Sequence, residues 1–211
     1  MNKHKNKGKG AVIVMAYAAC AADIAANIAQ NCASPNVGGY TGRGVLINLS
    51  DAPTFTVSGT NPRIITAITL GVGVKVCVVD NVAFEQPLNG SNTQSTGDEG
   101  MVKYDKTLVV NIPLRGAATA KNIVEPLHRS ALGFVLVAEK KDRNGDGSFE
   151  VIGFEQGLKA NADGVVRNEY ENDGSIVATL STRENHFENV FYDTDYATTL
   201  AAFESLIAAA Y

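Results

Sequence analysis

The residues best suited to bind an ion form one short run, Asp142-Arg143-Asn144-Gly145-Asp146-Gly147-Ser148-Phe149-Glu150. Its D-x-N-x-D-G start matches an EF-hand calcium loop, in which oxygen ligands alternate and a glycine makes the sharp turn. The glutamate expected at the loop's last position is replaced by Gly153, and the flanking segments have the composition of strands. A hairpin tip also needs Asn, Asp and Gly for its backbone alone. We therefore favour a plain turn and keep a calcium site as the alternative, with candidate ligands Asp142, Asn144, Asp146 and Glu150.

Catalytic motifs are not found in the sequence. The three histidines are far apart, and His186, between Glu184 and Glu188, has no nucleophile that its position would activate. The phosphate-binding pattern GxxxxGK[ST] is missing, and no GxGxxG opens a helix. The sequence therefore predicts a protein that is not an enzyme.

Charge divides the chain into a basic start and an acidic body. The net charge is −4, and setting aside Lys3, Lys5, Lys7 and Lys9 leaves −8 for residues 11–211. A nucleic-acid binder held by its folded body is expected to be basic, so specific nucleic-acid binding is disfavoured. Residues 142–195 hold twelve Asp or Glu against four Lys or Arg. This surplus predicts either a solvated face or a wall that repels phosphate while nucleic acid passes.

The beginning of the chain has two interpretations. The lysines are followed by apolar residues 11–19 and then by Cys20, an order that resembles a lipoprotein export signal. The Ala-rich pattern continues through residues 23–31 as an amphipathic helix. That continuation favours an arm that lies against another subunit, with Val12 and Val14 in a segment able to add a strand there. An exported surface lipoprotein or adhesin is the alternative. No run reaches the roughly 18 apolar residues of a membrane-spanning helix, so no membrane partner is expected.

Sequence periodicity predicts a β-rich body with few helices. Strands are expected where β-branched or alternating residues gather, at residues 45–49, 64–70, 72–79, 103–114, 133–139, 149–154 and 176–181. Residues 140–148 predict a hairpin turn, and the polar residues 86–100 predict a long loop, a length that usually serves function or assembly. Helices are predicted over residues 23–31, 117–130 and 196–209, the second one interrupted by Pro126.

These elements predict an α+β fold, mainly an antiparallel β-sandwich or barrel with two or three flanking helices. Residues 1–34 are expected to form an N-terminal assembly arm with a short helix, and residues 35–211 a single β-rich domain.

The order of several segments resembles one family of proteins. A short helix leads to residues 31–39 (NCASPNVGG) and then 44–48 (GVLIN); a hairpin of residues 134–139 and 149–153 is followed by 156–158 (QGL), 172–174 (NDG) and 177–184 (VATLSTRE). Over residues 23–205 this order resembles virion structural proteins of tailed phages that infect Bacteroidetes-type bacteria, in the tail-tube and neck-ring group. The Pro126-broken helix and the Ala-rich N-terminal helix are not diagnostic of tubes, so a neck ring stays open.

The resemblance implies a tail-tube-like subunit located in the virion and made in the host cytoplasm. Its partners would be copies of itself in stacked hexameric or dodecameric rings, other tail or neck proteins, and DNA that passes through the channel without specific binding. A neck, collar or capsid-decorating protein of the same virion is the alternative. The resemblance assigns ring stacking to residues 1–17 and 86–100, with candidate assembly residues Lys3, Lys5, Lys7, Lys9, Val12, Val14, Asn89, Asn92 and Asp98.

Deletion of residues 1–17 tests the role of the arm. We expect the shortened protein to remain folded as a monomer or single ring and to lose polymerisation, because the stacking contacts are removed. Size-exclusion chromatography and electron microscopy measure this, and normal tube formation by the deletion variant would contradict the assignment.

Overall fold

The computed structural model describes residues 37–80, 88–96, 102–113, 116–143, 145–167 and 175–210. All of them belong to one compact unit, Asn36–Tyr211. The predicted arm and helix within residues 1–34 lie outside the described residues, as do Asp98 and Asn144. No helix in the described ranges is long and apolar enough to cross a lipid bilayer.

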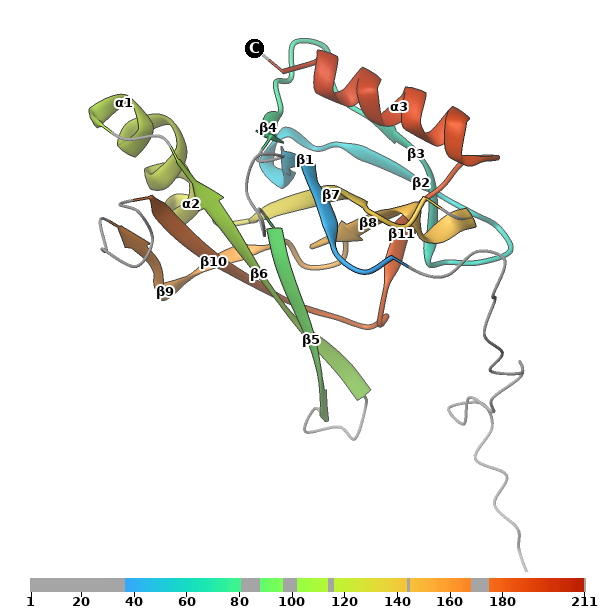
Figure 1. Cartoon of the computed structure of the whole chain (residues 1–211), viewed down its shortest axis with the longest axis horizontal. Coiled ribbons are helices and arrows are strands. Elements are labelled where there is room, and N and C mark those ends of the chain that lie inside the picture. Colours follow the sequence, from blue (N-terminus) through green and yellow to red (C-terminus); the bar gives the residue numbers. More distant parts are fainter. Residues whose placement is uncertain are drawn as a thin grey trace, which may run out of the picture. The chain divides into compact units, whose positions relative to one another are not determined.

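The larger sheet of the described structure has seven strands in the order β2-β3-β11-β8-β7-β1-β4 (Figure 1). Neighbouring strands are antiparallel except β11 and β3, which pair in parallel. The strands are β1 (Tyr40–Asn48), β2 (Thr54–Val57), β3 (Ile64–Thr69), β4 (Cys77–Asp80), β7 (Phe134–Lys140), β8 (Phe149–Ile152) and β11 (Asn189–Phe191).

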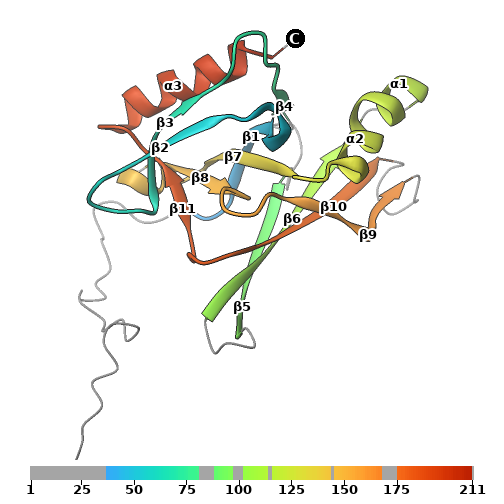
Figure 2. The same ribbon diagram turned by 180° about the vertical axis from the view of Figure 1, so that it is seen from behind.

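The smaller sheet has four antiparallel strands in the order β5-β6-β10-β9. They are β5 (Leu88–Thr96), β6 (Val102–Ile112), β9 (Lys159–Arg167) and β10 (Ile176–Glu184). The long helix α3 (Tyr196–Ala208) and the four-stranded sheet lie on opposite sides of the seven-stranded sheet, as Figures 1 and 2 show from front and back. Two 3-10 turns, η1 (Leu49–Asp51) and η3 (Gly145–Ser148), complete the larger sheet's connections.

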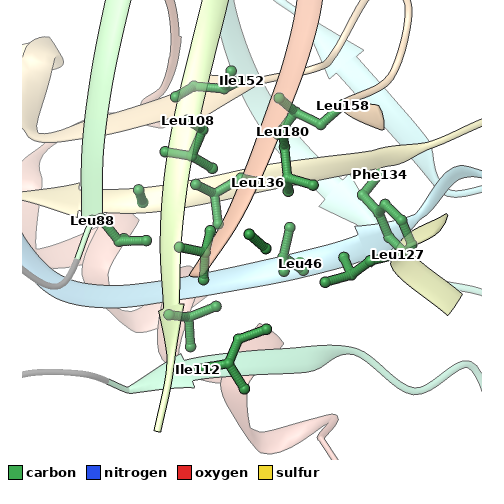
Figure 3. Packing of buried hydrophobic residues seen from close by; sticks show 14 of the residues in the cluster. Leu46, Leu88, Leu108, Ile112, Leu127, Phe134, Leu136, Ile152, Leu158 and Leu180 are labelled. Carbon is green, nitrogen blue, oxygen red and sulfur yellow. The ribbon is translucent and has the colours of Figure 1, made fainter. Parts of the chain in front are cut away.

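The central strands of the larger sheet are hydrophobic on both faces. Side chains alternate along a strand, so in β1 Val45 and Ile47 pack toward α3 while Leu46 packs toward the smaller sheet. In β7, Val135 and Val137 likewise face α3, and Leu136 joins the cluster between the sheets that Figure 3 shows. A sheet that is apolar on both faces must be covered on both, here by a helix and by a second sheet.

The chain leaves the larger sheet through a tight turn after β8. Gly153 and Gly157 have φ of +88° and +77°, and an added Cβ would lie 2.5 Å from the Phe134 carbonyl oxygen and 2.1 Å from the Leu132 carbonyl oxygen. Directly after Gly157, the backbone of Leu158 bonds to that of Phe134 in both directions, at 2.7 and 3.0 Å. Only glycine allows this approach, which places the start of β9 against the edge of β7.

Most predicted elements are confirmed, with shifted ends. Six of the predicted strands are present, namely β1, β3, β6, β7, β8 and β10. The predicted hairpin is formed by β7 and β8, in which Leu136 pairs with Ile152. The C-terminal helix is α3. The predicted helix over residues 117–130 is a short α1 (Ala117–Thr119), a π-helical turn η2 (Ala120–Val124) and α2 (Glu125–Arg129). The irregular turn directly precedes Pro126, which has no backbone N–H to continue the regular bonding.

Three expectations are wrong, and three strands were not predicted. Within the predicted loop over residues 86–100, Leu88–Thr96 form β5, which pairs along its whole length with β6. The strand predicted over residues 72–79 begins only at Cys77, after a turn at Val72 and Gly73. The strands that were not predicted are the short β2 and β11 and the nine-residue β9. Neither sheet of the described residues closes into a barrel, since the strand orders end at β2 and β4 and at β5 and β9.

Replacing Leu136 by Ala tests the cluster between the sheets. Leu136 is 0% exposed, so the variant should lose about 3 kcal/mol of unfolding free energy through lost contacts and a residual cavity. Urea denaturation measures the change. Leu132→Ala is the matched control: Leu132 is 56% exposed, and its truncation should change stability by less than about 0.5 kcal/mol. Equal effects of the two substitutions would contradict the described packing.

Candidate functional site

Strand β5 forms one edge of the four-stranded sheet, and no strand of the described part of the chain pairs with its outer side. Of its nine residues only Leu88 is buried, and its partner on the inner side is β6. The strand (LNGSNTQST) contains no charged residue and no proline. Figures 1 and 2 show the distal part of the β5–β6 hairpin extending away from the seven-stranded sheet. An exposed row of unpaired backbone groups of this length is a template for pairing with another strand.

A polar cleft of about 940 Å³ lies at the base of this hairpin, between β5 and the turn that joins β7 to β8. Asn89 and Gly90 of β5 line one side, and Tyr40, Lys140 and Glu188 line the other. The described chain begins at the same place, because Val37 and Gly38 also line the cleft.

Four charged or polar side chains organise the cleft. The Tyr40 hydroxyl donates to Glu150 Oε2 at 2.7 Å, and Lys140 Nζ lies 3.5 Å from the same oxygen. Lys140 also donates to Glu188 Oε1. Burial, together with the nearby Glu150 carboxylate, raises the pKa of Tyr40 far above its usual range. Burial alone would lower the pKa of Lys140, but the carboxylates of Glu150 and Glu188 outweigh it and raise that pKa.

The turn between β10 and β11 fastens the hairpin to the body. His186 Nδ1 lies 2.6 Å from Glu155 Oε1, and the Asn185 backbone N–H donates to Glu155 Oε2 at 2.7 Å. On the hairpin side, Asn92 Nδ2 donates to the Phe187 carbonyl oxygen at 3.2 Å. The rings of Phe187 and Tyr104 meet edge to face with centroids 5.6 Å apart. These contacts fix the direction in which β5 projects.

Three of the four residues proposed as calcium ligands lie in the described part of the chain. Asp146 lies exposed in η3, whereas Glu150 is buried and accepts the hydrogen bond of Tyr40. Asp142 lines the cleft, and Asn144 is outside the described residues. Within the described ranges, no three His, Cys, Asp or Glu side chains gather closely enough to hold a metal ion. Calcium binding stays a prediction.

Two of the predicted assembly residues, Asn89 and Asn92, lie on β5. The others, Lys3, Lys5, Lys7, Lys9, Val12, Val14 and Asp98, are outside the described residues. The sequence did not indicate Tyr40, Lys140 or Glu188 as site residues. Glu188 had been noted only as a neighbour of His186, which instead pairs with Glu155.

Comparison of the chain with protein-family models, with curated proteins and with solved structures finds no match.

Replacing Tyr40 by Phe tests the hydrogen bond at the centre of the cleft. Loss of a hydrogen bond to a buried carboxylate should cost about 2 kcal/mol of unfolding free energy at neutral pH. The pKa of Tyr40 is raised in the folded protein, so the advantage of the wild type is complete below the unfolded value, about pH 10. The difference in unfolding free energy between the wild type and Tyr40→Phe declines as pH rises above that value, because Tyr40 then ionises in the unfolded chain but not in the folded protein.

Urea denaturation from pH 7 to about 11 measures the difference between the wild type and Tyr40→Phe. Tyr192→Phe is the control, because the Tyr192 hydroxyl donates to the Thr194 carbonyl oxygen at an exposed site. The description of the cleft fails if the two variants behave alike, or if the Tyr40→Phe difference grows with pH.

Proposed function

We propose that this protein is a self-assembling structural subunit of the phage tail-tube type, forming stacked rings around a DNA channel. The observation that carries the proposal is β5: a nine-residue edge strand that is free of charge and proline, and exposed apart from the buried Leu88 and the half-buried Ser95. Proteins that avoid edge-to-edge association blunt such strands with lysine, proline or bulges. Along β5 these devices are missing, and the register with β6 runs without a shift.

Assembly by β5 gives a simple geometry. A strand from the next copy that pairs with the β5 edge extends the four-stranded sheet across the interface. A partner strand other than β5, such as the opposite edge β9, makes the contact heterologous, and a heterologous contact produces a ring when the rotation closes. The subunit would then be a tail-tube-like sandwich whose two sheets share one core. Six or twelve copies per ring, stacked with other tail or neck proteins in the virion, agree with this geometry.

One face of the four-stranded sheet packs against no described element, and this face suits the wall of a DNA channel. Leu108 and Val110 of β6 are buried between the sheets, so the alternate residues Asp105 and Thr107 face outward. Ser91 and Thr93 of β5 pair opposite them. Asp105 is itself paired with Arg183, Nε to Oδ1 at 2.6 Å, and this pair lowers the pKa of Asp105. A hydroxyl-rich face with paired charges on an acidic body offers phosphate no strong attachment.

A charge placed on β5 tests the proposal. Ser91→Lys adds a long cation to the exposed edge strand, and Ala67→Lys adds the same cation to an exposed position of β3, which has a strand on each side. The wild type and Ala67→Lys should form rings or tubes. Ser91→Lys should require about tenfold more protein to assemble, corresponding to roughly 1.4 kcal/mol per contact.

Analytical ultracentrifugation over a dilution series measures the assembly, and thermal unfolding shows that each variant is folded. Assembly of Ser91→Lys at the wild-type concentration would contradict pairing through β5. A wild type that stays monomeric at every concentration would contradict the proposed function itself.

A further inference from the structure

Three fully buried polar side chains meet where the two sheets join. Lys106 lies in β6, Glu184 ends β10, and Asn189 begins β11. Their exposed fractions are 1%, 0% and 0%. A lysine and a glutamate are almost never buried this completely unless they are paired. The contacts among these three side chains therefore decide how their burial is tolerated.

Glu184 holds the other two side chains on one carboxylate oxygen. Lys106 Nζ lies 2.6 Å from Glu184 Oε2, and Asn189 Nδ2 donates to the same oxygen at 3.2 Å. The other oxygen, Oε1, accepts from the Gly153 backbone N–H at 2.8 Å. The carboxylate is therefore fixed from the larger sheet while it brings an amine and a carboxamide together.

The group is incompletely satisfied as a structural ion pair. Among the residues that the structure describes, Lys106 Nζ makes no hydrogen bond beyond its contact with Glu184, and Asn189 Oδ1 is buried without a hydrogen-bond partner. Buried polar atoms in folded proteins are nearly always hydrogen-bonded, and exceptions call for an explanation. Covalent joining of the two side chains removes the lysine charge from the interior, and Asn189 Oδ1 stays there as the carbonyl oxygen of a neutral amide.

We propose that Lys106 and Asn189 form an intramolecular amide cross-link, with Glu184 as the catalytic proton carrier. Proton transfer within the ion pair turns the Lys106 ammonium into an amine and Glu184 into a carboxylic acid, which removes two charges from a buried site. Lys106 Nζ then forms a bond to Asn189 Cγ, and the Cγ–Nδ2 bond breaks. Nζ gives up two protons in total: Glu184 passes one to Nδ2, which leaves as ammonia, and the other leaves with it as ammonium.

The reaction needs no oxidant, reductant or cofactor, and Glu184 ends in its starting form. The new amide joins β6 of the smaller sheet to β11 of the larger sheet, so the two sheets could no longer separate. This inference is independent of the assembly proposed above, since it concerns bonds within one copy.

Peptide mass spectrometry of the purified full-length protein tests the cross-link. Trypsin does not cleave after an amide-linked lysine, so the linked protein should yield one branched peptide that joins residues 104–115 to residues 184–211, lighter than their sum by one ammonia. The branched peptide is the readout, and not the mass of the whole chain, because Asn89-Gly90 and Asn144-Gly145 lie outside both peptides and can lose the same mass by forming a succinimide. Fragmentation of the branched peptide locates the link.

Three variants assign the chemistry. Asn189→Ala and Glu184→Gln should yield the separate linear peptides, with cleavage after Lys106. Glu150→Gln is the control: it removes another buried carboxylate, bonded to Tyr40 outside the Glu184 group, and should retain the branched peptide. Circular dichroism reports whether each variant is folded. The branched peptide of the wild type tests the cross-link even if a variant fails to fold.

The proposal is overturned if the folded wild type gives only linear peptides with cleavage after Lys106. A branched peptide that persists in Glu184→Gln at the wild-type level would overturn the role of Glu184. Loss of the branched peptide in Glu150→Gln as well, with the fold retained, would also contradict the assignment to Glu184.

Discussion

The fold depends on a central sheet that is hydrophobic on both faces. Val45 and Ile47 of β1 face α3, and Leu46 between them faces the second sheet, so neither cover can be removed without exposing the core. The four-stranded sheet, in contrast, uses one face for this contact and leaves the other open. Its β5–β6 hairpin extends past the cover, which exposes the edge that we propose for assembly.

Buried charges lie at the boundaries between the layers. Glu139 at the end of β7 accepts from the Thr41 and Tyr196 hydroxyls, both at 3.1 Å, and so joins β1 to α3. Arg43 lies 3.4 Å from Glu139 and also packs over the Phe203 ring of α3. Removing one partner of such a pair is costly, whereas the intact pair adds little stability. These groups therefore specify how the helix and the two sheets are oriented.

Sequence patterns predicted the apolar strands well and the polar ones poorly. β1, β7 and β8 have runs of β-branched residues, and Leu108, Val110 and Ile112 alternate along β6 and are all buried, as predicted. β5 has Asn, Gly or Ser at five of its nine positions, so its strand conformation depends on pairing with β6, a tertiary effect. Lys106 stands in the same alternation as Leu108. The position of Lys106 two residues before Leu108, on the same face of β6, was the sequence signal that this lysine is buried. Its partners Glu184 and Asn189 are distant in sequence, and no local pattern relates them to Lys106.

Electron microscopy of the purified full-length protein, from dilute to concentrated solution, tests the central claim most directly. The account predicts hollow rings or stacked tubes in which β5 of each copy lies beside a strand of its neighbour. Dispersed single copies at every concentration, or rings whose contacts leave the β5 edge in solvent, would contradict it.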